Sequence, residues 1–290
     1  MFQVDLAVSS QCELGEGPVW HPGEQALYWL DIAQNRLHRH DYASQEHTVT
    51  ELGLLASAMG LRENGGFIMA TQRGFAFWDA SVGQYEFLGD PDASEGTDPR
   101  FNDGKTDRQG RFWAGKMGGT YENSLFRIDP DRSITRMESH VAVSNGLGWS
   151  PDNRTFYFTD SVARKIYAYD FDYAAGAIYN RRDFISVPLA EEEGLPDGLV
   201  VDSEGCIWSA RWGGWKVVRY DPHGKVMQEL RMPVQYPTSC ALGGPHLDEL
   251  FITSAWVECS PEQRSEQPQA GDIFRVQVDT PGLPESFFAA

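Results

Sequence analysis

Short apolar segments alternate with polar turns along most of the chain. The alternation is clearest in three stretches, namely NDGKTDRQGRFWAGKM from Asn102, NGLGWSPDNRTFYFTDS from Asn145 and DGLVVDSEGCIWSARWG from Asp197. Each reads as an apolar strand, a turn that contains Gly or Asn, and a second strand rich in aromatic and β-branched residues. Two more strands follow in each unit, as in SLFRIDPD, KIYAYDFD and KVVRYDPHG. The pattern predicts repeating units of four antiparallel strands.

The units recur at a regular interval. In each of the three clear stretches, a polar residue lies five positions before the residue that opens the inner turn. Counting back five positions from the corresponding turns in the rest of the chain gives Glu16, Ser57 and Thr238. Six units result, starting near residues 16, 57, 102, 145, 197 and 238. Repeats of about 40 to 50 residues with four short strands are typical of propeller blades. We predict an all-β fold, a six-bladed β-propeller whose four-stranded antiparallel blades surround a central channel.

Two further expectations concern the organisation of the chain. No linker is visible, so residues 1–290 are expected to form a single propeller domain. The early strand around Gln3 to Val8 has no unit of its own, and we expect it to complete the last blade and leave no free edge.

Composition limits the class of protein and its partners. The chain is 41% hydrophobic and 12% aromatic, which indicates a buried core rather than disorder. Its 42 acidic and 24 basic residues give a net charge of -18, which repels nucleic acid and anionic membranes. Four widely spaced cysteines are expected to be reduced thiols. With no signal peptide or spanning segment in sight, we expect a cytoplasmic monomer.

Six polar residues share one repeat offset, just before the strand that lines the channel of each blade. They are Glu16, Ser57, Asn102, Asn145, Asp197 and Thr238. Taken singly, Asn–Gly and Asp–Gly are ordinary turn dipeptides. Turn chemistry does not explain Glu16, Ser57 and Thr238 at the same offset, which favours a bound ion or substrate over a merely water-filled channel.

The donor types narrow the chemistry of this ring. Carboxylate and amide oxygens suit Ca²⁺, Mg²⁺ or Mn²⁺, whereas a zinc site would more usually include His or Cys. The seven histidines show no metal-ligand spacing. There is also no G-x-S-x-G motif, so the sequence offers no candidate for covalent nucleophilic catalysis.

Several motifs resemble those of a known family. LGEGPVW from Leu14, RFNDGKTDRQGRFWAGKM from Arg100, SNGLGWSPDNRTFYFTDS from Ser144, PDGLVVDSEGCIWSARWGG from Pro196 and PTSCALGGPHLDELFITSA from Pro237 resemble the SMP-30/gluconolactonase family of regucalcin-like sugar lactonases. The resemblance covers nearly the whole chain. It implies a six-bladed propeller with one divalent cation on the channel axis, and hydrolysis of an aldono-1,4- or 1,5-lactone to the aldonic acid.

The resemblance also implies roles for particular residues. The family's metal ligands fall on Glu16, Asn145 and Asp197, and Asp197 is also the proposed base. The substrate-binding residues fall on Arg100 and Asn102. Glu122 is a candidate for a further acidic substrate contact, in a loop after Met117 that is shorter than in the animal members. The cation could be Ca²⁺, Mn²⁺, Mg²⁺, Zn²⁺ or Fe²⁺, and whether it or Asp197 activates the attacking water stays open.

Two other functions remain open at this point. A paraoxonase-like or phosphotriesterase-like hydrolase generally has a second, structural metal and a histidine near the catalytic one, and no matching histidine is found. A calcium-binding, regucalcin-like protein without catalysis is the other alternative. Assays on aldonolactones with and without a chelator would separate the three.

Overall fold

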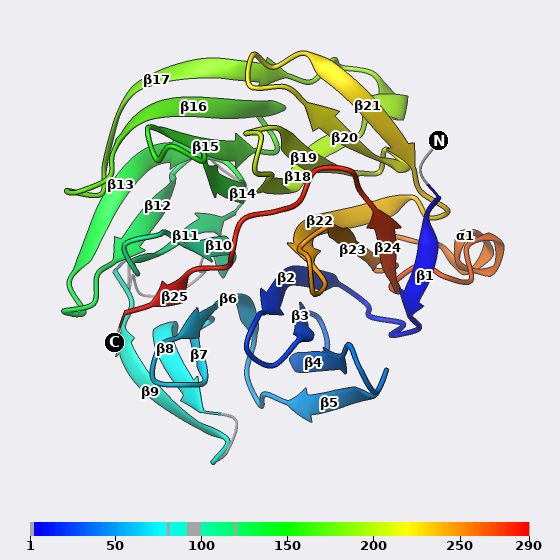
Figure 1. The fold of residues 1–290 in the computed structure, drawn as a ribbon, viewed down its shortest axis with the longest axis horizontal. Coiled ribbons are helices and arrows are strands. Elements are labelled where there is room, and N and C mark those ends of the chain that lie inside the picture. Colours follow the sequence, from blue (N-terminus) through cyan, green and yellow to red (C-terminus); the bar gives the residue numbers. More distant parts are fainter. Residues whose placement is uncertain (1–2, 80–81, 92–99, 119–120, 290) are drawn as a thin grey trace.

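Six small sheets surround a central axis in the computed structural model (Figure 1). The structure describes residues 3–79, 82–91, 100–118 and 121–289. In five of the blades the four blade strands follow one another in sequence from the axis outwards, each antiparallel to the next. The prediction of an all-β, six-bladed propeller is confirmed.

The first three blades share this simple order. Their strands are β2 (Gly15–His21), β3 (Ala26–Asp31), β4 (Arg36–Asp41) and β5 (His47–Glu51); β6 (Ala56–Arg62), β7 (Phe67–Thr71), β8 (Gly74–Asp79) and β9 (Gln84–Gly89); and β10 (Arg100–Thr106), β11 (Phe112–Met117), β12 (Asn123–Ile128) and β13 (Ile134–Val141).

The fourth and fifth blades repeat the order, and the sixth departs from it. The strands are β14 (Ser144–Trp149), β15 (Thr155–Asp160), β16 (Lys165–Asp172) and β17 (Ala177–Ser186); β18 (Leu195–Val201), β19 (Ile207–Trp212), β20 (Lys216–Tyr220) and β21 (Val226–Arg231); and β22 (Tyr236–Gly243), β23 (Glu249–Ala255), β24 (Ile273–Gln277) and β1 (Asp5–Val8). β1 pairs with β24, so the early strand completes the last blade as predicted.

The inner turns that set the repeat are held by a buried aspartate. The Asp107 carboxylate accepts hydrogen bonds from the backbone N–H groups of Gln109 and Arg111 and, at 3.0 Å, from the indole Nε1 of Trp113. Asp202 and Trp208 repeat the indole contact at 3.2 Å in the fifth blade. The turn and the following aromatic strand are thereby fixed together, since a buried polar turn must be fully hydrogen-bonded.

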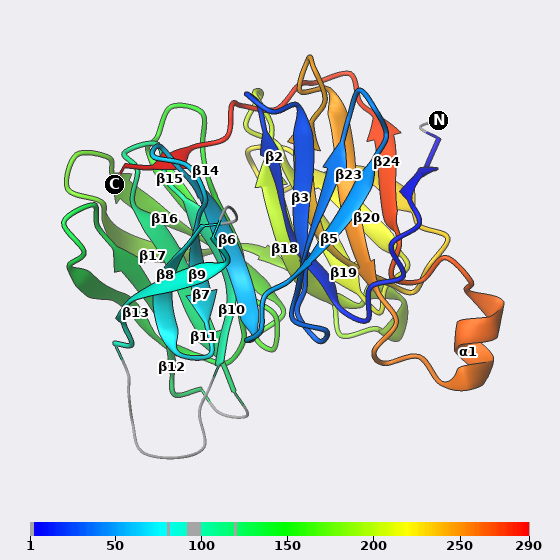
Figure 2. The same ribbon diagram turned by 90° about the horizontal axis from the view of Figure 1, so that it is seen from below.

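The chain's C-terminal part closes one end of the channel. Beyond β24 it crosses the face of the ring to β25 (Phe287–Phe288), which pairs in parallel with β6 in the second blade (Figures 1 and 2). Along this path Glu285 Oε2 lies 3.5 Å from Nζ of Lys105. These contacts involve the last residues of the innermost strands. The first residues of those strands therefore lie at the opposite, uncrossed end of the channel.

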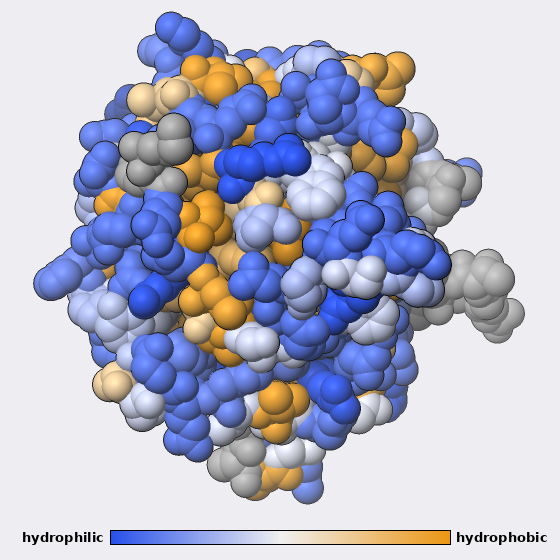
Figure 3. All heavy atoms as spheres, turned by 90° about the vertical axis from the view of Figure 1, so that its right-hand side faces the viewer, coloured by the Kyte–Doolittle hydropathy of each residue, from blue (hydrophilic) through white to orange (hydrophobic). Residues whose placement is uncertain are grey.

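Little of the described chain is helical. A 3₁₀ turn, η1 (Glu191–Glu193), lies between β17 and β18, and α1 (Pro261–Glu266) lies between β23 and β24. Neither has the length or apolar character that crossing a membrane would require. All four cysteines are free thiols, as expected. The flank that carries β1 and α1 is mostly hydrophilic, with small separated hydrophobic areas (Figure 3).

Candidate active site

Every innermost strand is irregular at its first residues. The pairing between first and second strands shifts register beside Glu16, Ser57, Asn102, Asn145, Asp197 and Thr238. Such β-bulges interrupt the alternation of a strand and redirect side chains, and they are frequent beside functional sites. The bulges therefore turn polar side chains toward the axis at one end of the channel.

A cavity of about 360 Å³ occupies this end. Its polar wall consists of Glu16, Arg100, Asn102, Asn145, Ser161, Asp197 and Glu258. The rest is apolar, formed by Leu14, Met117, Val143, Val162, Leu195, Trp212 and Val257. The volume suits a ligand of a few hundred daltons or less, and the few convergent polar groups are typical of a small-molecule site.

Two carboxylates in the cavity lining, Glu16 and Asp197, are buried, and the charge of Asp103 acts on both. Burial, followed by the negative charge of Asp103, raises the pKa of Glu16 to about 8. The pKa of Asp197 is also held well above its ordinary value, by burial first and then by Glu16 and Asp103. None of these three carboxylates forms an ion pair with a residue that the structure describes. They repel one another, and the charges of Arg100 near Glu16 and of Lys105 near Asp103 offset this only in part, since the pKa values of Glu16 and Asp103 stay raised.

Amide and guanidinium groups complete the polar wall. The Nδ2 group of Asn145 donates to Oγ of Ser161 at 3.1 Å, and Oγ of Ser161 donates to the carbonyl of Pro196 at 2.7 Å. This chain fixes the Asn145 amide so that Oδ1 stays available as an acceptor. Arg100 Nη1 donates to Oδ1 of Asn102 at 3.0 Å, which orients that pair at the cavity wall.

The structure brings most of the predicted residues together. Glu16, Arg100, Asn102, Asn145 and Asp197 all line the cavity. Glu122 is exposed and is absent from the cavity lining in the described part of the chain, while residues 119–120 of its loop lie outside that part. The assignment of roles to these residues stays a prediction.

Two members of the predicted polar ring serve the blades instead. Oγ of Ser57 donates to the carbonyl of Ala70 at 3.4 Å, and Oγ1 of Thr238 donates to the carbonyl of Gly15. Both hydroxyls are buried. The Ser57 contact lies within the second blade, and the Thr238 contact joins the innermost strands of the sixth and first blades. These contacts explain polar residues at the two positions without a ligand.

Asp103 is the residue that the repeat offset missed. Its carboxylate accepts from the N–H of the following glycine at 2.7 Å, as the Glu16 side chain does at 2.9 Å and Asn145 does at 3.2 Å. Burial raises its pKa to about 6. A glycine directly after a polar residue was the available signal, and it places Asp103 in the same local motif as Glu16 and Asn145.

The donor set fits a divalent cation. Glu16, Asp197 and the Oδ1 atom of Asn145 offer hard oxygen ligands, and buried carboxylates that repel one another favour a bound positive charge. No histidine lines the cavity among the residues that the structure describes. Glu16, Asn145 and Asp197 are thus able to hold Ca²⁺ or a similar ion.

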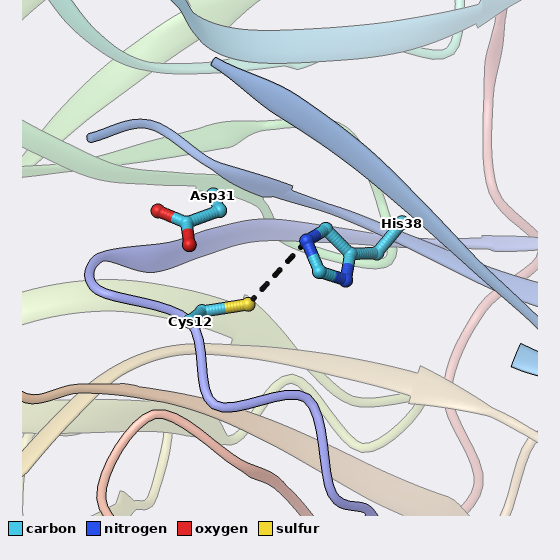
Figure 4. A group of neighbouring side chains, drawn as sticks. All are labelled: Cys12, Asp31 and His38. Carbon is cyan, nitrogen blue, oxygen red and sulfur yellow. Dashed lines mark hydrogen bonds between the residues drawn. The ribbon is translucent and has the colours of Figure 1, made fainter. Parts of the chain in front are cut away.

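A second group of potential ligands lies away from the cavity, where Cys12, Asp31 and His38 meet (Figure 4). Sγ of Cys12 lies 3.7 Å from Nε2 of His38 and accepts from the indole of Trp29 at 3.3 Å. The Asp31 carboxylate accepts three backbone N–H groups, from residues 13, 14 and 34. Each group therefore has partners within the protein, and Nδ1 of His38 also lies 2.9 Å from Nε2 of His47. The cluster acts as a buried hydrogen-bond network in the first blade, and the backbone N–H of Cys12 ties it to the carbonyl of Gly271, just before β24.

Comparison with known proteins gives consistent matches. Residues 14–256 match the family described as the SMP-30/gluconolactonase/LRE-like region. The chain is 38% identical to pentonolactonase XacC of Haloferax volcanii, covering 97% of both chains, and 39% identical to 6-deoxy-6-sulfogluconolactonase of Pseudomonas putida, covering 95% of both. Among solved structures, it matches a calcium-binding protein, regucalcin, from Agrobacterium tumefaciens with a TM-score of 0.93 and 27% identity, covering 100% of this chain and 98% of the other.

Proposed function

The chain belongs to the SMP-30/gluconolactonase/LRE-like family, and on that premise we propose that it is a metal-dependent lactonase. The reaction would open an aldono-1,4- or 1,5-lactone to the aldonic acid. The observation that carries this proposal is the cavity that joins the buried carboxylates of Glu16 and Asp197 to the Arg100–Asn102 pair. The named relatives act on different lactones, a pentonolactone and a sulfogluconolactone, which supports the reaction class rather than one substrate.

Lactone hydrolysis needs a nucleophilic water and stabilisation of the charge that develops on the carbonyl oxygen. A divalent cation held by Glu16, Asn145 and Asp197 would supply that stabilisation as a Lewis acid. Asp197 would accept the proton of the attacking water and return it to the ring oxygen as the carbon–oxygen bond breaks. The product is then the open-chain hydroxy acid.

Arg100 and Asn102 would bind and orient the sugar. The guanidinium has N–H donors beyond the one shared with Asn102, and both residues suit the hydroxyl groups of a polyol. The apolar wall with Trp212 would pack against the carbon face of the ring. Holding the lactone in one orientation would bring its carbonyl carbon within reach of a water activated by Asp197.

Chelation tests the proposal directly. The protein is stripped with EDTA, its metal content is measured, and Ca²⁺, Mn²⁺, Mg²⁺, Zn²⁺ or Fe²⁺ is restored during assays on glucono-1,5-lactone and a pentono-1,4-lactone. We expect activity to disappear on stripping and to return with at least one ion. Full activity in protein shown to be metal-free would refute metal dependence.

A calcium-binding role without catalysis is the second candidate. The similarity to the Agrobacterium tumefaciens protein, described as calcium-binding, favours it, and the same three residues would bind the ion. It predicts that Ca²⁺ raises the melting temperature, yet no aldonolactone is hydrolysed above the spontaneous rate with any of the five ions. The assays above distinguish the two functions.

A further inference from the structure

A second cavity of about 360 Å³ opens beside the candidate active site. It lies between the β7–β8 turn, where Arg73 is exposed, and the β10–β11 pair. Arg100 lines both cavities. The two cavities therefore meet at the Arg100 side chain.

The second cavity is lined by more cations than anions. Arg73, Arg100 and Lys116 contribute positive charge, and the one acidic residue among its described lining is Asp90. Asp90 Oδ1 lies 2.8 Å from Nζ of Lys116 and offsets that charge. Within the described residues, Arg73 and Arg100 form no ion pair. The negative charge of Glu16, in the first cavity, also acts on Arg100, so the excess of positive charge among the described lining residues is centred on Arg73.

These cations are held in place. The Arg73 guanidinium carbon lies 3.9 Å from the centre of the Phe87 ring. Nζ of Lys116 lies 5.1 Å from the centre of the Phe101 ring, and Lys116 is only 2% exposed. Cation–π contacts and burial restrict the side chains in advance, so an anion that binds there loses less conformational freedom.

Neutral hydroxyl groups would not require this arrangement, because amide and hydroxyl side chains satisfy them equally well. Arginine forks are suited to carboxylate, sulfonate and phosphate groups. The acidic remainder of the surface does not cancel the attraction at contact distance, since salt screens charges beyond about 8 Å at physiological ionic strength.

We propose that the second cavity receives an anionic group at the far end of the substrate, so that the preferred substrate is a sugar lactone with a terminal carboxylate, sulfonate or phosphate. Arg73 would bind that group and Arg100 would connect it to the lactone site. This inference rests on the lactonase function proposed above and names its substrate class.

The test compares two lactones that differ only in the terminal group, glucono-1,5-lactone and its 6-phosphate. The full-length, metal-loaded protein should hydrolyse the phosphate with a kcat/KM about 10-fold higher, mostly through a lower KM. Arg73→Gln should lower kcat/KM for the phosphate about 10-fold and leave the neutral lactone unchanged. Raising the salt concentration should reduce the wild-type advantage.

Arg154→Gln is the matched control. The Arg154 side chain is 86% exposed, in a turn at the end of the innermost strands away from the active site. Its replacement changes the net charge by the same amount as Arg73→Gln. It should leave the ratio of the two kcat/KM values unaltered. A wild-type ratio of one or less, or an equal loss for both lactones in Arg73→Gln, overturns the inference while the lactonase function stands. Failure to hydrolyse either lactone refutes the function itself, and the substrate assignment falls with it.

Discussion

Asp197 is subject to opposing demands at the scale of a single residue. The proposed reaction uses its negative charge, whereas burial, Glu16 and Asp103 all disfavour that charge in the protein alone. A buried, uncompensated carboxylate destabilises the fold that contains it. Activity and stability should therefore respond in opposite directions when the charge is removed.

Asp197→Asn is the substitution that separates the two effects. It keeps the size and the bulge of the residue but deletes a ligand charge and the proposed base. We expect kcat to fall by about 10² to 10⁴, the range usual for an acid–base group. The melting temperature of the metal-free protein should rise, because one repelling charge is gone. Near-wild-type turnover at saturating metal would show that Asp197 is no more than a turn residue.

Ser161 should influence the metal without touching it. Its hydroxyl accepts from Asn145 and donates to Pro196, which fixes the Asn145 amide. Partners that orient a ligand typically contribute about 10- to 100-fold in metal affinity. Ser161→Ala should weaken cation binding by that factor, measured by calorimetry, with kcat at saturating metal little changed. An unaltered affinity would mean that the bulge alone orients Asn145.

At the scale of the strand, the bulge explains what the sequence could predict and what it could not. The repeat offset located Glu16, Asn145 and Asp197 because each innermost strand begins at the same point of the unit. Strict alternation places Asp103 on the face opposite Asn102. The register shift between Phe101 and Gly104 leaves Asn102 and Asp103 outside the regular pairing. In the sequence, the glycine that follows Asp103 is the one sign of this shift.

The bulges also require close packing between neighbouring innermost strands. A Cβ atom at Gly146 would lie 2.7 Å from the Asp197 carbonyl and 2.6 Å from the amide nitrogen of Leu199. Because both are backbone atoms, β14 and β18 would have to separate. Gly146→Ala should destabilise the fold by about 1–3 kcal/mol and weaken cation binding.

Gly23→Ala provides the control for that prediction. At Gly23 the nearest atom to a new Cβ belongs to the His21 ring, at an ordinary 3.4 Å. This variant should unfold in denaturant like the wild type. If Gly146→Ala does so too, and binds the cation normally, the two innermost strands are not in the tight contact described.

For the molecule as a whole, the blades followed from the sequence pattern, whereas the C-terminal crossing did not. β25 is two residues long and pairs in parallel with a strand of a different blade, so no periodic pattern precedes it. The Cys12–Asp31–His38 network was missed for a related reason. Its members come from the approach to β2 and from β3 and β4 and share no sequence spacing, so only the folded first blade brings them together.

That network should make folding sensitive to acid. Burial, followed by His47, lowers the pKa of His38 to about 3, from 6.5. Between these values the unfolded chain binds a proton that the folded protein excludes, so stability falls as the pH drops below 6.5. The loss from this residue is at most about 1.4 kcal/mol per pH unit.

Denaturation with a chelator present, at pH 7 and at pH 5, measures this dependence. His38→Gln removes the titrating ring and should reduce the difference in unfolding free energy between the two pH values. His223→Gln, at an exposed turn position, should leave the difference as it is in the wild type. An equal pH dependence in all three proteins would show that His38 is accessible to protons in the folded state.

The closure of the sixth blade has a consequence for biosynthesis. Asp5 pairs with Arg275, so β1 waits during synthesis for a partner that lies far along the chain. At about 5–20 residues per second, the interval is roughly 15–55 s. During that time the β1 segment of every nascent chain is unpaired. Since any copy of β1 can complete any sixth blade, dense polysomes favour exchange of this strand between chains, and slower expression should yield fewer swapped oligomers.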